Sequence, residues 1–353
     1  MSIQIFERIF NQCVDRDEPF SFQILLDELN QLTPEKTEKL LVPYTSDEMT
    51  LIKIAKESLI RNFCMNPAIK ESPKFNTCFL KKFFDFLNND ECSERILAQS
   101  LFLLHAGKTE CHLLNKYEIE LMFINYFEQF DSIEPDFNTN HPIFNDFLSI
   151  FKTLIQSLSF TDIIDKTIRE IVSSKSNSDV FEYQSLKLIF FNSNFTCLYG
   201  FSGKDRIYVN IRPIVEFLKI SLGEKEKMTI AKLNFIRLVL HETSHVVLRF
   251  KLNDLNLSSP FLDEHIKRGN VYKKVKECGF EAEKKLFKGH IDWKLSSYKK
   301  INLDYCLQVL DNILNGLPVD FDIERANVVV IPEENIQSFG FSISFKRQPL
   351  FLF

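Results

Sequence analysis

The residues best suited to chemistry in this chain are two histidines and a glutamate close together in the sequence. His241, Glu242 and His245 stand in the order HExxH, inside a run from Thr229 to Phe250 that lacks glycine and proline and predicts a helix. Residues four apart lie on one face of a helix, so both imidazoles can bind one zinc ion at about 2.0–2.1 Å. Glu242 can then accept a proton from a water held by that ion. The pattern predicts metal-dependent hydrolysis.

The positions around the motif indicate a buried helix rather than a solvated one. The neighbours are all uncharged: Leu240, Thr243, Ser244, Val246 and Val247. A solvated helix face would normally carry Lys, Arg or Glu among them. Two histidines and a glutamate are costly to bury without partners, which favours a bound ion. The alternative is a core helix whose histidines bond to the backbone or to each other.

With this motif the chain resembles the zincin metallopeptidases, whose active helix is likewise buried and uncharged around the histidines. The resemblance extends from the predicted strands near Leu186 to a predicted helix ending near Phe287. It implies a zinc cofactor, a small sheet before the active helix and a peptide or protein substrate. It does not identify one peptidase family.

The residues after the motif distinguish two branches of the zincins. Metzincins continue as HExxHxxGxxH, but Leu248 and Lys251 occupy the glycine and histidine positions here, which excludes that branch. Gluzincins take a glutamate from a second helix downstream. The resemblance to gluzincins implies that Glu277 is the third ligand and that Glu281 supports a motif histidine from behind, as the aspartate of their ExxxD pair does.

The third ligand has alternatives. Glu281 can be the ligand with Glu277 in support, or the ligand can be His265, His290 or another acid. Without the HExxH motif, the acids of this segment would be interpreted as a solvated face that pairs with neighbouring lysines. Cys278 can also reach a metal, although a lone cysteine on a helix is more often a small buried residue.

Zinc in such a site would acidify a bound water and polarise the scissile carbonyl. Glu242 would take the proton from that water and pass it to the leaving amine. Gluzincins supply a Tyr or His from the C-terminal side to stabilise the oxyanion. By that resemblance Tyr298 and His290 are candidates, as are Tyr305 and His265.

The composition predicts a mainly α (α+β) protein. Glycine (9) and proline (12) are few and phenylalanine (36) is abundant, which favours a large core with few turns. We expect a helical region of unknown role over 1–172 and a zincin-like domain over 180–353, divided by the polar stretch Ser173–Asp179. Expected helices in the first region are Ser2–Cys13, Phe20–Leu32, Ser46–Phe63, Lys74–Leu87, Ser93–Leu104, Lys116–Phe130 and Pro142–Leu158.

In the second region, strands precede the motif helix. Leu186–Phe191 reads as a strand, and Ser202–Asp205 as a hairpin turn between two more. Pro213 should open a helix to about Leu222. After the motif we expect helices at Pro260–Lys267, Val271–Phe287 and Leu303–Leu314, late strands at Val328–Ile331 and Phe339–Phe345, and a packed apolar tail.

Charge and cysteine content indicate which partners the protein can bind and in which compartment it is found. The net charge is −5 and no dense Lys/Arg block exists, so we expect no nucleic-acid partner. No apolar run reaches the length of a membrane span, and the first residues lack the features of a signal peptide. The eight scattered cysteines indicate reduced thiols. We therefore expect a cytoplasmic protein, although a protein exported by a non-classical route would have the same sequence features. The sequence does not predict the oligomeric state.

Three functions are compatible with these patterns. The leading hypothesis is a zinc metallopeptidase, with the helical half covering the cleft or recruiting substrate. The alternative is a non-catalytic helical interaction or scaffold protein with a degenerate zincin-like half. A zinc hydrolase acting on a non-peptide amide or ester is a third.

Overall fold

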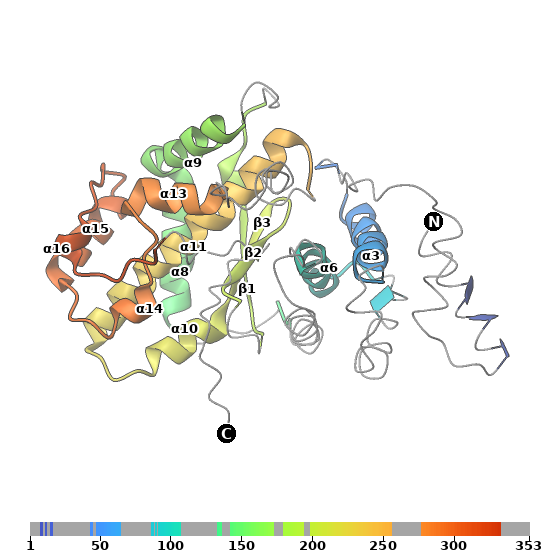
Figure 1. Cartoon of the computed structure of the whole chain (residues 1–353), viewed down its shortest axis with the longest axis horizontal. Coiled ribbons are helices and arrows are strands. Elements are labelled where there is room, and N and C mark those ends of the chain that lie inside the picture. The colour runs from blue at the N-terminus through green and yellow to red at the C-terminus, as the bar shows by residue number, and fades with distance from the viewer. Residues whose placement is uncertain are drawn as a thin grey trace, which may run out of the picture. The chain divides into compact units, whose positions relative to one another are not determined.

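The structure is a computed structural model, in which two compact units can be distinguished, Met1–Pro135 and Asp136–Phe353 (Figure 1). It describes residues 8–9, 11–12, 15–16, 43–44, 47–64, 86–87, 89, 91–106, 133–135, 142–172, 179–193, 198–255 and 277–332. The described residues are mostly helical, with one small three-stranded sheet. This agrees with the predicted mainly α class.

In the first unit, two helices pack against each other. These are α3 (Glu48–Cys64) and α6 (Glu94–Ala106), close to the ranges predicted from the sequence. Asp47 precedes α3 and accepts a hydrogen bond from the backbone N–H of Thr50, as an N-cap does. The predicted helices at 20–32, 74–87 and 116–130 lie wholly or mostly outside the described residues, as does most of 2–13.

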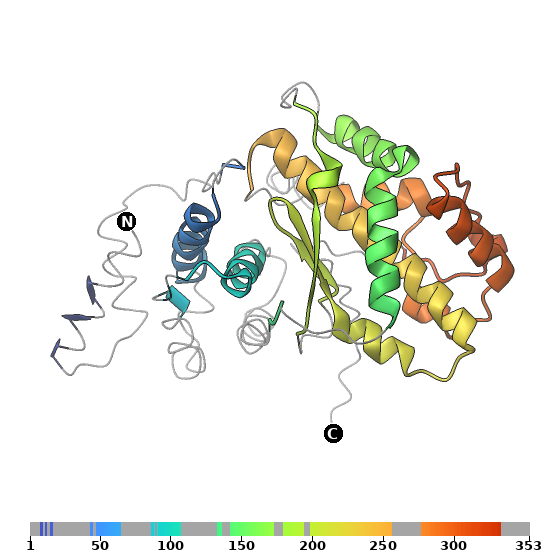
Figure 2. The ribbon, with the colours of Figure 1, turned by 180° about the vertical axis from the view of Figure 1, so that it is seen from behind.

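The second unit is built around α11 (Glu224–Leu252), which carries the HExxH motif. The helix is buried along most of its length because other elements cover it on several sides (Figures 1 and 2). On one side, α8 (Pro142–Gln156) stacks Phe147 on Phe235 with ring centroids 4.2 Å apart. Helix α9 (Leu158–Ile171) also packs on α11. On another side lies the sheet, where a Cβ built on Gly200 would be 3.4 Å from Leu238.

The sheet has the order β1-β3-β2, with strands β1 (Lys187–Phe191), β2 (Gly200–Ser202) and β3 (Arg206–Asn210). Strand β1 pairs with β3 in parallel and β2 pairs with β3 antiparallel. The tight turn between β2 and β3 is closed by a hydrogen bond from Gly203 N to Arg206 O (2.8 Å). The strand and hairpin predicted from the sequence occur here, and β2 ends at Ser202, the first residue of the predicted turn.

Asn210 joins the sheet to the helix that follows it. The residue is buried at the end of β3 and is the N-cap of α10 (Ile211–Leu218), which begins before Pro213 and ends before the predicted Leu222. Its Oδ1 accepts hydrogen bonds from the N–H groups of Ser193 and Arg212. Its Nδ2 donates to the carbonyl of Leu198. One side chain therefore fixes the end of the sheet and the start of α10.

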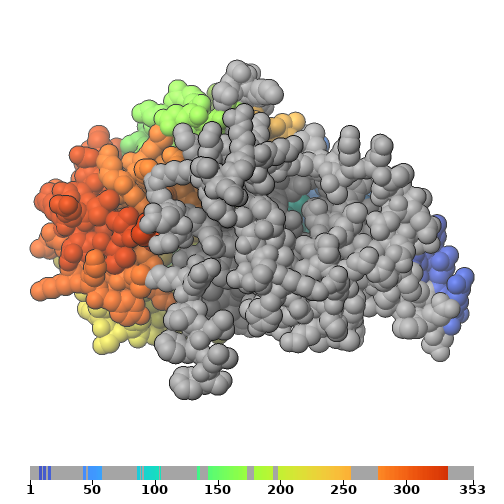
Figure 3. All heavy atoms as spheres, in the orientation of Figure 1, coloured from blue at the N-terminus to red at the C-terminus, as the bar shows by residue number. Residues whose placement is uncertain are grey.

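After the motif helix, four helices form the C-terminal side of the unit. They are α13 (Cys278–Phe287), α14 (Trp293–Ser296), α15 (Leu303–Leu314) and α16 (Ile323–Ala326). Figure 3 shows them as one continuous orange-to-red part of the surface. Trp293 is buried between Phe287 and Phe321 and holds α14 on the end of α13.

The predicted bounds of α15 agree with the structure, whereas the strand predicted at 328–331 is a single antiparallel bridge between Ile291 and Val330. The predicted helix at 260–267, the beginning of the one at 271–287, the strand at 339–345 and the C-terminal tail lie outside the described residues.

The division between the units falls earlier than the expected boundary near residue 172. It lies after Pro135, so that α8 and α9 belong to the unit that carries the motif. The reason is packing: Phe144 of α8 contacts Phe190 of β1, and Glu170 of α9 forms an ion pair with Lys285 of α13.

Among the described residues, no single helix is long and apolar enough to cross a membrane. In the described part of the chain, the pair α8 and α9 taken together reaches that length and composition, and the two helices meet at 65°.

Replacing Asn210 by Ala should lower the free energy of unfolding of this unit by about 2–4 kcal/mol, because the N–H groups of Ser193 and Arg212 and the carbonyl of Leu198 lose their partner. Trp293 is the only tryptophan in the chain and is buried in this unit, so its fluorescence during urea unfolding measures the change. Asn315→Ala is the control, since that side chain is exposed and should matter by less than about 0.5 kcal/mol. Equal effects of the two substitutions would contradict the role given to Asn210.

Candidate metal centre

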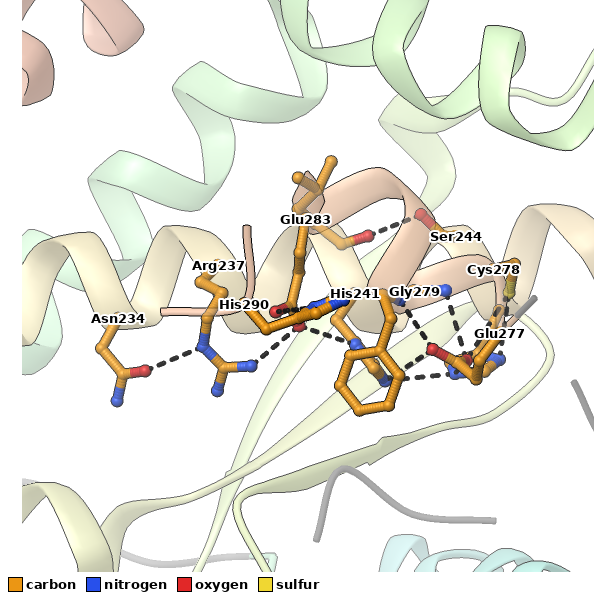
Figure 4. A network of polar contacts seen from close by, with 12 residues as sticks. Asn234, Arg237, His241, Ser244, Glu277, Cys278, Gly279, Glu283 and His290 are labelled. Atoms are coloured by element: carbon orange, nitrogen blue, oxygen red, sulfur yellow. Dashed lines mark hydrogen bonds and ion pairs between the residues drawn. The ribbon is translucent and has the colours of Figure 1, made fainter. Parts of the chain in front are cut away.

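The motif residues lie on α11 where α13 crosses it (Figure 4). His241 and Glu242 are both 2% exposed, and the His245 side chain is 13% exposed. The two imidazole rings are one helical turn apart on the same face, as the spacing predicts. Their Nε2 atoms point toward each other at 3.3 Å.

The carboxylate of Glu277 faces the same point as the two Nε2 atoms. Its Oε1 lies 2.6 Å from Nε2 of His245, and its Oε2 lies 3.9 Å from Nε2 of His241. Ligand atoms of these three residues all lie within 4.8 Å of one another. Two atoms bound at about 2.0–2.1 Å to a tetrahedral ion are about 3.3–3.4 Å apart. The spacing of the imidazole nitrogens fits such an ion, whereas the 2.6 Å between His245 and Glu277 is that of a direct hydrogen bond.

Glu277 reaches this place because it is the N-cap of α13 and not part of the helix. Its backbone is extended (φ −81°, ψ 126°), and its carboxylate accepts hydrogen bonds from the N–H groups of Gly279 (3.2 Å) and Phe280 (2.6 Å). The helix N-terminus and its free N–H groups stabilise the negative charge there. The cap therefore orients the carboxylate toward the imidazoles.

Glu281 does not take the place expected for it. The expectation assumed that Glu277 and Glu281 share a helix face, but a non-helical Glu277 removes that relation. Glu281 is half-buried and is not part of the group formed by the two histidines and Glu277. The carboxylate behind a motif histidine belongs to Glu283, which is 1% exposed.

Glu283 holds His241 from the side opposite the ion position. Its Oε1 lies 2.8 Å from Nδ1 of His241, the ring nitrogen that does not face Glu277. A carboxylate on the outer nitrogen fixes the ring and leaves Nε2 to bind a metal. Sequence reasoning missed Glu283, although its spacing of four from Gly279 places both on the face of α13 that meets His241.

Gly279 allows α13 to approach His241 closely. A Cβ built on Gly279 would lie 2.5 Å from Cγ and Nδ1 of the His241 ring. No real Cβ makes such a contact, so any larger residue would have to move the ring or the helix. The absence of a side chain at position 279 therefore sets the distance between α11 and α13.

Cys278 lies behind the other histidine. Its buried Sγ is 3.4 Å from Nδ1 of His245 and 4.0 Å from Oε1 of Glu277. With Nε2 of His245 facing Glu277, the thiol is beside the outer nitrogen of the ring. The two histidines thus have different neighbours, a carboxylate for His241 and a thiol for His245.

The electrostatics of the cluster favour a positive charge. Burial alone would lower the pKa of His241, but the carboxylates of Glu277, Glu283 and Glu242 raise this pKa to about 9. Burial would likewise raise the pKa of Glu283, yet Arg237 and His241 lower it to about 2. Several buried carboxylates therefore act on the point between the imidazoles, which suits a cation.

Glu242 is buried beside the first histidine, and its charge is one of those that raise the pKa of His241. It immediately follows His241 on α11, so it belongs to the same turn of the helix. Its charge therefore acts on the imidazole of His241.

The described residues predicted to stabilise an oxyanion do not face the point between the imidazoles. Tyr298 is 72% exposed, and a side chain in solvent is not held against a bound carbonyl. His290 is buried behind His241, with Nδ1 3.9 Å from Oε2 of Glu283, and so lies on the outer side of the ring. The hydroxyl of Tyr305 is used within the C-terminal helices, where it accepts from Asp322 N. His265 lies outside the described residues.

Comparisons of the chain with protein-family models, with curated proteins and with solved structures found no match.

Replacing Gly279 by Ala should lower the free energy of unfolding by about 2–3 kcal/mol, because the added methyl overlaps the buried ring of His241. Gly223→Ala is a matched control, since a Cβ there meets nothing within 4 Å and the change should stay within about 1 kcal/mol. Urea unfolding followed by Trp293 fluorescence measures both. If Gly279→Ala is as well tolerated as Gly223→Ala, α13 does not pack on His241 as described.

Proposed function

We propose that this protein is a zinc-dependent metallopeptidase in which His241, His245 and Glu277 bind the ion and Glu242 is the general base. The observation that carries the proposal is the convergence of the two Nε2 atoms and the Glu277 carboxylate within 4.8 Å. Both histidines lie on α11 and Glu277 precedes α13, so helix periodicity alone would not bring all three together.

The donor set favours zinc over other ions. Two imidazole nitrogens and one carboxylate oxygen suit a borderline ion such as Zn²⁺, whereas Mg²⁺ and Ca²⁺ prefer oxygen ligands. Three protein ligands are the usual number in catalytic zinc sites, where the fourth position is left for water or substrate. The carboxylate of Glu283 lies on Nδ1 of His241, and histidines that bind zinc through one ring nitrogen commonly have a carboxylate on the other.

Bound zinc would acidify a water and polarise a carbonyl. Residues of the chain would then transfer the proton and hold the ligands. Glu242 accepts the proton of the attacking water and delivers it to the leaving amine. Glu283 and the helix cap at Glu277 keep the ligands in place during this exchange.

One observation favours a second candidate, a non-catalytic role in an interaction or scaffold protein. The carboxylate of Glu277 already caps α13 and lies 2.6 Å from His245, an arrangement that a direct hydrogen bond between a histidine and a glutamate would also give. In that case the cluster holds α11 and α13 together without turnover.

Metal analysis separates the two candidates. Elemental analysis of the full chain purified without added metal should give about one zinc per chain, and His245→Ala should lose it. A chain that contains no metal, takes up none and keeps its stability in a chelator would support the scaffold and contradict the peptidase.

Glu242→Gln should keep the zinc and lower hydrolysis at least about 100-fold, because the amide cannot accept the proton. The assay is cleavage of a complex peptide mixture by the zinc-loaded protein, read by mass spectrometry. Glu281→Gln is the matched control: the residue is half-buried and outside the ligand group, so it should leave zinc content and cleavage unchanged.

A Glu242→Gln variant that cleaves as fast as the parent would exclude Glu242 as the base. A zinc-loaded parent that leaves every peptide intact but hydrolyses small esters or non-peptide amides would replace the peptidase by a hydrolase of another class.

A further inference from the structure

Behind the candidate metal centre, a chain of polar contacts extends away from His241, buried at Glu283 and half-buried at Arg237 and Asn234 (Figure 4). Arg237 donates from Nη1 to Oε1 of Glu283 at 2.8 Å, and from Nε to Oδ1 of Asn234 at 3.0 Å. Glu283 in turn lies 2.8 Å from Nδ1 of His241 through the same Oε1. The contacts therefore run in one line from Asn234 to the imidazole.

The positions on α11 explain why these groups meet. Arg237 lies one turn before His241, so the guanidinium and the imidazole project from the same face of the helix. Glu283 enters between them from α13. Both donors converge on one oxygen, which leaves the carboxylate little freedom to rotate away from His241.

We propose that Arg237 is a positioning residue for the metal centre, acting through Glu283 on His241. The inference rests on the metal-binding part of the proposed function. Arg237 holds the Glu283 carboxylate against Nδ1 of His241, and this keeps Nε2 directed at Glu277 and His245. Without Arg237, the ring loses the partner that fixes its orientation, and metal affinity falls.

Charge is the first reason to assign this role to Arg237. Glu283 is 1% exposed, and a buried carboxylate needs a compensating charge or it becomes costly. Arg237 supplies that charge at 2.8 Å. His290 faces the other oxygen of Glu283 at 3.9 Å, which is beyond hydrogen-bonding distance.

The shape of the guanidinium is the second reason. Asn234 accepts from Nε while Glu283 accepts from Nη1, so two fixed donors of one planar group are used at once. A lysine would restore the charge but has no second donor at that angle. We therefore expect Arg237→Lys to rescue only part of what Arg237→Met loses.

The test is zinc affinity of the full chain, measured by competition with a chromophoric chelator. Arg237→Met should weaken zinc binding 10- to 100-fold, the usual effect of removing an outer partner, and Arg237→Lys should weaken it less. Arg249→Met is the matched control: Arg249 is a buried arginine on the same helix, but its Nη1 donates to Ser202 of β2. It should cost stability and leave zinc affinity unchanged.

A second readout follows the geometry of the site directly. The visible absorption of the Co²⁺-loaded protein should change in Arg237→Met and stay like the parent in Arg249→Met. Trp293 fluorescence of the metal-free variants establishes that each is folded. Should Arg237→Met fail to fold, Asn234→Ala takes its place, since it loosens the guanidinium without removing charge and should weaken zinc binding by a smaller factor.

A folded Arg237→Met variant with zinc affinity and Co²⁺ spectrum like the parent would overturn the inference, and so would an equal loss in Arg249→Met. A parent that binds neither Zn²⁺ nor Co²⁺ would instead refute the proposed function itself. The two failures are therefore distinguishable in one experiment.

Discussion

The contact between the start of α13 and the middle of α11 is the constraint on which the candidate site depends. Glu277 accepts hydrogen bonds from the first N–H groups of α13, and the same carboxylate faces the imidazoles of His241 and His245. The backbone at Gly279 lies directly against His241, so the two helices can be this close only where a side chain is missing. The rest of the unit holds these helices in place: α8, α9 and the sheet surround α11, and Trp293 fixes the far end of α13.

The stability of this contact between α11 and α13 depends on how its buried charges are compensated. Carboxylates removed from water are stabilised only by partners, and here these are helix N–H groups, a guanidinium and imidazoles. The raised pKa of His241 and the lowered pKa of Glu283 express the same fact, that each group is stabilised in its charged form by the other and by its neighbours. A field that attracts a proton to an imidazole also attracts a metal ion, and the spacing of the two Nε2 atoms suits a tetrahedral one.

The two histidines are supported unequally. His241 is backed by a carboxylate that is itself held by Arg237 and Asn234, whereas His245 has the thiol of Cys278, a weak hydrogen-bonding partner, beside its outer nitrogen. The outer nitrogen of His241 thus faces a carboxylate and that of His245 a thiol, while Nε2 of His245 lies 2.6 Å from Oε1 of Glu277. His245 is also the more exposed of the two.

The sequence by itself determined the local features. The spacing of His241 and His245 places them on one face of any helix, the lack of glycine and proline makes that helix long, and the turn at Ser202–Asp205 closes a hairpin. Tertiary structure decided which acid meets them. Glu277 caps α13 from outside the helix, and the close approach at Gly279 brings the face that carries Glu283 against His241. Likewise α8 and α9 join the motif unit through contacts with residues far along the chain, which no local pattern encodes.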